Sequence, residues 1–334
     1  MIRDEDHQRF ANWISDSQRL VLTTHMNPDG DALGSEIGLA LFLEQLGHHV
    51  TLLNADPTPD SLAFLLDGRP APIVFEETDG RRRLANADRV ILLDNSAPDR
   101  LGCMERAMVE VASKTCCIDH HPTRGMPWSE RVLDVSASAT SEIVYDLVTG
   151  RGWIPDRVAA RALYVGIATD TGFFRFNSTT ANAHRIVSAL LDLGVETADC
   201  YRRLYERNSL AFTRLLGQAL SDIQLDGAGA VASVRLTQAL LNDLEAQNED
   251  VSEIANVLLA MDGVRIALLF RELREGSVKV SLRSKGPLDV HALAVRYGGG
   301  GHRNASGIVA LGSIADVAAE VVSRAVELVA AEKE

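Results

Sequence analysis

The sequence predicts a two-domain α/β protein, with a mainly parallel sheet flanked by helices, a helical connector and a smaller α+β domain. Over residues 19–170, short apolar runs of strand-forming residues alternate with longer amphipathic runs, which is typical of a parallel sheet covered by helices. Residues 181–221 keep helical periodicity without a strand pattern, and strands and helices then follow one another irregularly. We therefore expect domains at 1–190 and 223–334, joined by a connector at 191–222.

The first domain shows strand patterns at RLVLTTH (19–25), HVTLLNA (49–55), RVILLDN (89–95) and KTCCIDHH (114–121). The amphipathic run DALGSEIGLALFLEQLG predicts a helix between the first two strands. In VAARALYVGIATDTGFFRF, we expect a helix, a turn at Asp170–Gly172 and a short extended piece. Ligands of parallel sheets collect beyond the carboxyl ends of the strands, so residues at these ends are candidates for a site.

The second domain is expected to open with a strand at AVASVRL and a helix at DVSEIANVLLAM. VRIALLFREL and SVKVSLRS predict two paired strands. The glycine run GGGGHRNASG and an amphipathic helix at 314–331 complete it.

The composition restricts the function classes. A formal net charge of −13 predicts that the surface as a whole repels nucleic acid, so a polyanionic substrate must be held locally. The four cysteines have neither metal-ligand spacing nor an extracellular disulfide pattern, and we expect reduced thiols. The charged stretch MIRDEDHQRF lacks an apolar signal core, and no run is long enough to span a bilayer. We expect a cytoplasmic protein with no membrane partner.

Polar side chains at the strand ends and after the long helix predict a metal centre. They are His25, Asp29, Asp31, Asp94, His120 and Asp170. Four ionised carboxylates that converge would repel one another unless cations lay between them. Carboxylates and imidazoles without thiolate suit Mn²⁺ best, with Mg²⁺, Co²⁺ or Zn²⁺ as alternatives. Six side chains exceed what one catalytic ion needs, so we expect two divalent cations bridged by Asp94.

Each of these residues has a structural alternative when taken singly. Asp29 and Asp31 could be turn or N-cap residues of the helix that starts near Ala32. His25 could be satisfied by backbone at a strand end, and Asp119 could hydrogen-bond and orient a neighbouring histidine. Their coincidence at one sheet edge favours the metal interpretation.

The motifs HMNPDGDALGS, DNSAPDRLG, DHHP, GIATDTGFFRF and GGGGHRNASG occur in this order over nearly the whole chain. In this combination the sequence resembles the DHH/DHHA1 phosphoesterases, most closely the stand-alone two-domain members that degrade nanoRNA and dephosphorylate adenosine 3′,5′-bisphosphate. The resemblance implies an N-terminal DHH domain that binds metal and a C-terminal DHHA1 domain that binds substrate. One departure is Asn95, where relatives often carry a small or apolar residue.

The resemblance also implies roles for individual residues. One ion is expected on His25, Asp29 and Asp94, and the other on Asp31, Asp94, His120 and Asp170. His121 is expected beside the metals, facing the phosphate. We take Asp94, Asp119 and His121 as the candidate catalytic residues.

The glycines Gly298–Gly301 are expected to bind an anion. Consecutive glycines let backbone N–H groups approach a phosphate, and His302 and Arg303 add positive groups. A flexible linker is the alternative, but the run lies between a predicted helix and a predicted strand. Alternation along SLRSK puts Ser281 and Arg283 on one face, while Lys285 could equally be a solvated cation.

The candidate substrate-binding residues are Arg175, Ser281, Arg283, Gly299, Gly300, Gly301, His302 and Arg303. For Arg175, a salt bridge to an acidic neighbour is the alternative. In the resembling family, the strand and the glycine loop form the substrate-recognition domain.

We therefore expect a two-metal phosphoesterase that releases 5′-mononucleotides from short single-stranded RNA and removes the 3′-phosphate of adenosine 3′,5′-bisphosphate. A homodimer is expected because relatives are often dimers. One alternative is a phosphodiesterase for cyclic di-AMP or for linear dinucleotides such as pApA or pGpG. A non-catalytic nucleotide-binding module is another, though none of the six ligands is missing. A manganese pyrophosphatase is disfavoured by the glycine loop, and a glycine-cradle NTPase by the absence of Walker A spacing.

Overall fold

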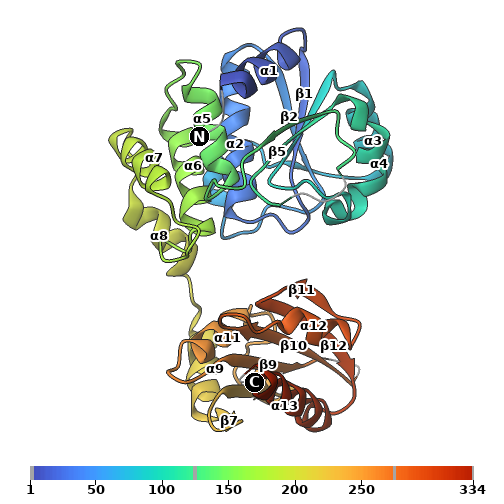
Figure 1. Ribbon diagram of the computed structural model, residues 1–334, viewed down its shortest axis with the longest axis vertical. Helices are drawn as coiled ribbons and strands as arrows, with labels where there is room; N and C mark the ends of the chain where they lie inside the picture. Colours follow the sequence, from blue (N-terminus) through green and yellow to red (C-terminus); the bar gives the residue numbers. More distant parts are fainter. Residues whose placement is uncertain (1–3, 123–125, 274–275, 333–334) are drawn as a thin grey trace. The chain divides into compact units, whose positions relative to one another are not determined.

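The computed structural model describes residues 4–122, 126–273 and 276–332, and the chain divides into two compact units, Met1–Arg207 and Asn208–Glu334. The division falls inside the segment 191–222 that the sequence analysis assigned to a connector. Each unit has its own six-stranded sheet (Figure 1).

The first unit contains the following described elements: α1 (Asp4–Ile14), β1 (Arg19–Thr23), α2 (Gly30–Gln45), β2 (His49–Asn54), η1 (Ala63–Leu66), β3 (Ile73–Val74), α3 (Glu77–Asn86), β4 (Arg89–Leu93), η2 (Pro98–Met104), α4 (Glu105–Glu110), η3 (Ala112–Lys114), β5 (Thr115–Asp119), β6 (Glu130–Leu133), α5 (Thr140–Thr149), α6 (Arg157–Asp170), α7 (Ala181–Asp192) and α8 (Thr197–Tyr205).

The sheet of the first unit has the strand order β3-β2-β1-β4-β5-β6, and its described strand pairs are all parallel. The chain proceeds outward from β1 to β2 and β3, and then in the other direction through β4, β5 and β6. The order thus reverses between β1 and β4. In open parallel sheets, ligands bind beyond the carboxyl ends of the strands at such a switch point.

Helices cover both faces of this sheet, and each covered face has its own hydrophobic core. On one face α2, α5 and α6 lie together, and Leu22 and Ile91 of the sheet are buried in a cluster with Leu163 of α6 (Figure 1). On the other face, a second cluster joins Val90 of the sheet to Met108 of α4. Because both faces are buried, the strands are apolar along their length rather than alternating.

Glycines let α2 and α6 approach closely beside the sheet. A Cβ on Gly34 would lie 2.4 Å from the carbonyl oxygen of Ala162, so no side chain fits between the helices at this point. A Cβ on Gly166 would lie 2.7 Å from Asp31 Oδ1. The close packing therefore leaves room for the Asp31 carboxylate at the carboxyl end of the sheet.

The second unit contains the following described elements: α9 (Leu210–Ser221), β7 (Gln224–Asp226), β8 (Val231–Leu236), α10 (Gln238–Asp243), α11 (Ser252–Leu259), β9 (Ile266–Glu272), β10 (Ser277–Ser284), α12 (Val290–Val295), β11 (Gly300–His302), β12 (Ala305–Leu311) and α13 (Ile314–Ala331).

The second sheet has the order β11-β12-β10-β9-β8-β7 and is mixed, because β8 and β9 are parallel and the other described pairs are antiparallel. Phe270 and Val280 are buried on one face with Val321 of α13. Leu269 and Val234 are buried on the other face with helices α9, α10 and α11. This is the α+β arrangement that the sequence predicted.

The expected extended piece after α6 is wrong. Residues 171–178 form turns, in which Phe173 and Phe174 have left-handed φ angles of 54° and 66°. The Phe173 N–H donates to the Ala168 carbonyl at 2.7 Å, and the Phe174 ring packs 5.1 Å from the His184 ring. Packing of the Phe174 ring against His184 therefore accompanies left-handed φ angles that bulky residues seldom adopt.

Candidate metal centre

The sheet topology brings the first two candidate ligands together. His25 follows β1 and Asp94 follows β4, the two strands at which the order reverses. His25 Nε2 lies 3.4 Å from Asp94 Oδ2. Asp94 has a left-handed φ of 57°, which is uncommon for a residue other than glycine, and its N–H donates to the Ile118 carbonyl of β5 at 3.0 Å. The strand end is thus bent sharply at the carboxylate.

Asp29 joins these two residues while also capping α2. Its Oδ1 accepts from the N–H groups of Asp31 and Ala32, both at 3.0 Å, and its Oδ2 lies 3.8 Å from His25 Nε2. One atom each from His25, Asp29 and Asp94 lie within 4.8 Å of one another. The capping role that the sequence left open for Asp29 therefore coexists with a place in the cluster.

Asp31, His120 and Asp170 form a second group, whose candidate ligand atoms also lie within 4.8 Å of one another. His120 Nε2 is 3.0 Å from Asp170 Oδ2 and 3.6 Å from Asp94 Oδ1. Asp94 therefore contacts members of both groups. Asp94 is the residue that the sequence analysis expected to bridge two cations, and that role stays a prediction.

The chemistry of the two imidazoles fits a divalent cation. The Nδ1 atom of His25 lies 2.8 Å from the Met26 carbonyl, and that of His120 lies 3.2 Å from the Ala137 carbonyl. A carbonyl accepts, so Nδ1 donates in both rings and Nε2 is the ring nitrogen that faces the carboxylates. Both Nε2 atoms are buried without a hydrogen-bond partner among the described residues and face carboxylates, the arrangement expected of metal ligands.

Without a cation, the negative charges of the carboxylates repel one another. Burial and the charge of Asp170 raise the pKa of Asp31 to about 7, and burial and the charge of Asp31 raise the pKa of Asp94 well above its usual range. Burial alone would lower the pKa of His120, but the carboxylates of Asp170, Asp31 and Asp94 raise it to about 10. In the metal-free cluster, bound protons thus offset the charge of the carboxylates, which bound cations would otherwise neutralise.

Asp119 and His121 lie beside the second group. The His121 ring Nδ1 donates to Asp119 Oδ1 at 2.8 Å, and the His121 N–H donates to the same oxygen at 3.0 Å. Burial would raise the pKa of Asp119, but these bonds from His121 hold it below the usual range. Asp119 is fully buried and His121 is partly exposed, so Asp119 orients a ring whose Nε2 is left to face other groups.

Two buried contacts at this sheet edge were missed by sequence reasoning. The Asp31 carboxylate accepts from the N–H groups of Thr140 at 2.6 Å and Ser141 at 2.8 Å, at the start of α5. Thr140 Oγ1 also donates to Asp94 Oδ1 at 2.9 Å. Positive charge at the helix N-terminus thus stabilises both carboxylates. The segment ASATSE has residues typical of a helix start, but nothing in it indicates a contact with Asp31, more than 100 residues earlier.

A third missed feature is a buried polar chain behind the strand ends. Thr24 Oγ1 donates to the Leu93 carbonyl at 2.9 Å, and the Thr24 N–H donates to Asn54 Oδ1 at 3.3 Å. Asn54 Nδ2 in turn donates to Glu36 Oε2 at 2.9 Å. Burial raises the pKa of Glu36 to about 8. This chain ties together the ends of β1, β2 and β4, next to His25 and Asp94.

Comparisons with known proteins agree with this geometry. Residues 19–167 match the DHH family N-terminal domain, and residues 228–331 match the DHHA1 domain. The chain is 34% identical to the bifunctional oligoribonuclease and PAP phosphatase NrnA of Thermus thermophilus, over 92% of this chain and 89% of that protein. It is 30% identical to the NrnA of Bacillus subtilis, over 88% of this chain and 90% of that protein.

The chain belongs to the DHH/DHHA1 phosphoesterase family. Metal-dependent hydrolysis of phosphoesters is the chemistry of this family, and the first unit supplies the acidic and imidazole side chains for it. Among solved structures, an exopolyphosphatase-related protein from Bacteroides fragilis is similar, with a TM-score of 0.91, 28% identity and coverage of 98% of this chain and 97% of that one.

In the DHHA1 unit, the glycine run forms part of the sheet instead of a free loop. Gly300–His302 is strand β11, an edge strand paired antiparallel with β12. A Cβ on Gly299 would lie 2.2 Å from the Gly307 carbonyl oxygen, and one on Gly301 would lie 2.5 Å from the Ala305 carbonyl oxygen. Two of the glycines are therefore required by close backbone approach, whereas Gly300 faces open space. The side chain of His302 lies outside the described part of the chain.

The cations predicted to bind substrate are spread over both units. Ser281 and Arg283 share one partly exposed face of β10, as alternation predicts, and burial lowers the pKa of Arg283. The exposed Arg303 donates to the Pro287 carbonyl at 2.8 Å. In the DHH unit, the Arg175 guanidinium lies 5.4 Å from the Phe176 ring centre, and within the described ranges it forms no ion pair. The salt-bridge alternative for Arg175 is therefore not seen.

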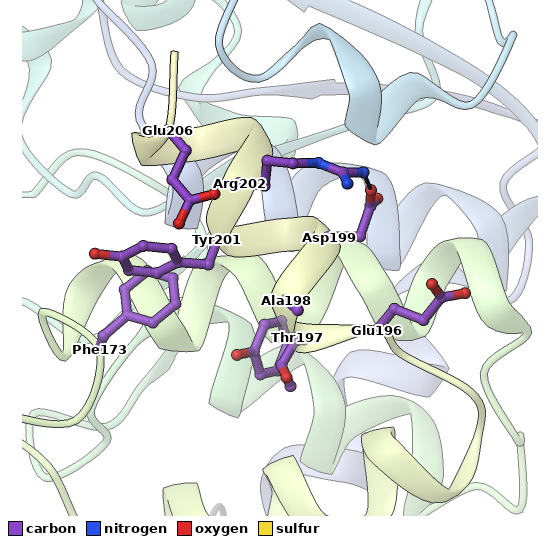
Figure 2. Close-up of a pocket in the computed structure, with 9 residues that line it drawn as sticks. Phe173, Glu196, Thr197, Ala198, Asp199, Tyr201, Arg202 and Glu206 are labelled. Carbon is purple, nitrogen blue, oxygen red and sulfur yellow. Dashed lines mark hydrogen bonds and ion pairs between the residues drawn. The ribbon is translucent and has the colours of Figure 1, made fainter. Parts of the chain in front are cut away.

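A cavity of about 560 Å³ lies along α8 in the DHH unit (Figure 2). Its lining includes the carboxylates of Glu196, Asp199 and Glu206, and Figure 2 shows the Arg202 guanidinium turned toward Asp199. None of the predicted site residues lines it. Negative charge and a paired arginine disfavour a phosphate ligand here, so this cavity is not the phosphoester site.

Among the helices formed by residues 4–122, 126–273 and 276–332, none is both long enough and apolar enough to cross a membrane.

Proposed function

We propose that this DHH protein hydrolyses very short single-stranded RNA to 5′-mononucleotides and removes the 3′-phosphate of adenosine 3′,5′-bisphosphate. The observation that carries the proposal is the pair of adjacent carboxylate and imidazole groups at the switch point of the sheet, where Asp94 of the first group lies 3.6 Å from His120 Nε2 of the second. The NrnA relatives, which this chain matches over about nine-tenths of their length, are bifunctional oligoribonucleases and PAP phosphatases, and this supports the substrate choice.

We infer that His25, Asp29 and Asp94 hold one divalent cation and that Asp31, Asp94, His120 and Asp170 hold the other. Mn²⁺ is the proposed ion because the donor set combines hard carboxylate oxygens with imidazole nitrogens and has no thiolate. When bound, such a pair supplies Lewis acidity that lowers the pKa of water and clamps phosphoryl oxygens.

The protein groups have separate proposed roles. Asp119 fixes the His121 ring through Nδ1, so the Nε2 atom of His121 is the ring nitrogen that can face a phosphate oxygen and donate to it. In the DHHA1 unit, the residues proposed to bind nucleotide are Ser281, Arg283, Gly299–Gly301, His302 and Arg303. In the DHH unit, Arg175 is a further proposed substrate contact. Local cations of this kind offset the overall charge of −13.

The test is a hydrolysis panel with purified protein and Mn²⁺. The substrates are an RNA dinucleotide, an RNA five-mer, adenosine 3′,5′-bisphosphate, cyclic di-AMP, pApA and pyrophosphate. We expect the highest kcat/KM on the dinucleotide and the bisphosphate. A protein that leaves both untouched and hydrolyses cyclic di-AMP or pApA would replace the proposed substrates with the dinucleotide alternative.

We further propose that the protein acts in the cytoplasm as a homodimer. The four cysteines are free in the structure, which agrees with a reducing compartment. Sedimentation equilibrium should give twice the chain mass of 36.2 kDa. A mass of one chain at micromolar concentration would exclude the dimer.

A further inference from the structure

A single short segment, Ala137–Ser141, contacts residues from both sides of the second ligand group. The Ala137 carbonyl accepts from His120 Nδ1, and the N–H groups of Thr140 and Ser141 donate to Asp31. Thr140 Oγ1 donates to Asp94. The position of this segment therefore sets the orientation of three proposed ligands at once.

The same segment is tied to the chain that follows Asp170. Ser138 Oγ donates to the Ser178 carbonyl at 2.9 Å and lies 3.2 Å from Thr180 Oγ1. The Thr180 N–H in turn donates to Ser138 Oγ at 3.3 Å. Ser138 is fully buried, so these contacts fix the turns at 171–178 against the start of α5.

Glu142 closes this arrangement with both of its carboxylate oxygens. Its Oε2 accepts from the Ser138 N–H at 2.9 Å, and its Oε1 accepts from Asn182 Nδ2 of α7 at 2.8 Å. Glu142 is only 3% exposed. A buried carboxylate that bridges two elements in this way makes directional contacts that a hydrophobic side chain could not replace.

We propose that Glu142 and Asn182 form a positioning pair that sets the affinity of the site made by Asp31, His120 and Asp170. The proposal rests on the metal centre proposed above. Neither residue contacts a ligand side chain directly. They act through Ser138, whose neighbours in the chain hold His120 and Asp31, and through α7, which follows the turns after Asp170.

The first group depends much less on this pair. His25 is held by the Met26 carbonyl, and Asp29 is held by the N-terminus of α2. Of the first group, only Asp94 contacts the segment Ala137–Ser141, through its hydrogen bond from Thr140 Oγ1. Disturbing the pair should therefore weaken one ion selectively, an effect that general destabilisation would not produce.

The test uses two variants of the full-length protein after removal of metal, titrated with Mn²⁺ by isothermal calorimetry. In Glu142→Gln, the new N–H₂ faces either the Ser138 N–H or the Asn182 side chain. Asn182 could accept from it only by turning its Oδ1 away from Arg185, so one bond is lost in either case. In Asn182→Ala, Glu142 loses its bond to α7, and an exposed bond from Arg185 to Asn182 Oδ1 is lost with it. We expect one of the two Mn²⁺ sites to weaken about tenfold in Glu142→Gln and less in Asn182→Ala, at the lower end of the effect seen for direct partners of metal ligands, because the pair acts through Ser138 and α7.

A matched control comes from α11, where Asn256 Nδ2 donates to Glu253 Oε2 at 2.8 Å on an exposed helix surface. Asn256→Ala should bind both ions as the unaltered protein does. In the two test variants, saturating Mn²⁺ should restore kcat on the RNA dinucleotide with KM unchanged, because the substrate contacts are untouched.

Three results would overturn the inference. If the unaltered protein binds two ions and both variants bind them equally well, Glu142 and Asn182 do not position the site. If both sites weaken together as the metal-free Tm falls, the pair is only structural. If the unaltered protein binds no Mn²⁺, the proposed metal centre itself fails.

Discussion

In the DHH unit three of the six proposed ligands, His25, Asp31 and Asp94, are almost fully buried, whereas the proposed substrate contacts in the described part of the DHHA1 unit are partly or fully exposed. Asp31 and Asp94 are almost fully buried and accept hydrogen bonds from the start of α5. Arg303 and the glycine Gly300 lie at the surface on an edge of the second sheet.

The difference indicates a division of labour between the units. Buried carboxylates cannot rearrange, so they can hold cations in one geometry. Their mutual repulsion is relieved when cations bind. Exposed arginines and open backbone can adapt to phosphates of different nucleotides. Changes in the first region should therefore alter rate, and changes in the second should alter substrate affinity.

Removal of the metal is the change from which we expect the largest effect on hydrolysis. Chelation is expected to abolish hydrolysis of the RNA dinucleotide, and added Mn²⁺ should restore it. Because cations neutralise the carboxylates of the folded protein only, Mn²⁺ at 100 times its Kd should stabilise the protein by about 2.7 kcal/mol for each site. Differential scanning calorimetry and a rate assay measure the two effects. Full activity in protein shown by mass spectrometry to be metal-free would contradict the division.

Asp94→Asn should have the next largest effect. The amide keeps an acceptor for Thr140 Oγ1 but removes the charge shared between the two groups. We expect kcat to fall about 10³-fold, the size found when one transition-state stabilising group is lost. The metal-free Tm should stay the same or rise, because one of several repelling carboxylates is gone. A kcat within tenfold of the unaltered value would argue against Asp94 as the bridge.

Arg283→Ala should affect affinity rather than rate. We expect KM for adenosine 3′,5′-bisphosphate to rise about tenfold, equivalent to about 1.4 kcal/mol, while kcat changes less than twofold. The exposed Arg235 of β8 in the same unit offers a matched control, since it is not among the proposed contacts. If Arg283→Ala lowers kcat and leaves KM unchanged, the DHHA1 unit takes part in the chemistry.

Glu36→Gln should leave activity almost unchanged and alter the pH dependence of stability. Burial raises the pKa of Glu36 to about 8, so the folded state binds a proton more tightly than the unfolded state. The unaltered protein therefore loses stability as the pH rises from the unfolded pKa of Glu36, near 4.5, toward 8, at roughly 1.4 kcal/mol per pH unit.

Glutamine has no charge to bury and its oxygen can still accept from Asn54 Nδ2. The variant should therefore equal the natural protein near pH 5 and exceed it increasingly up to pH 8, as measured by urea unfolding. A constant difference across this range would show that Glu36 does not titrate in the fold.

The sequence predicted the two sheets and the residues of the ligand cluster because strand ends are local signals. An apolar run followed by a carboxylate is visible within ten residues, and parallel strands place such ends at one edge. The comparisons confirm the family that the motifs indicated. The ligand assignments and substrate contacts stay predictions.

What the sequence did not predict depends on contacts distant in the chain. Asp31 accepts from the N–H groups of Thr140 and Ser141, more than 100 positions later. In the turns after α6, the Phe174 ring packs against α7 and the Phe173 ring against α8, and strand β11 depends on pairing with β12. None of these is encoded in a short window, because each is selected by a tertiary neighbour.

The wide separation of the cluster along the chain, from His25 to Asp170, has a consequence for biosynthesis. A nascent chain lacks Asp170 until the DHH unit is almost completely translated, so no shorter product can assemble the second group. The cation proposed for that group could therefore be captured only by a nearly finished unit, whereas the first group has all three of its residues once Asp94 is made. Ion selection then rests on the completed geometry and on the free metal concentrations of the cell.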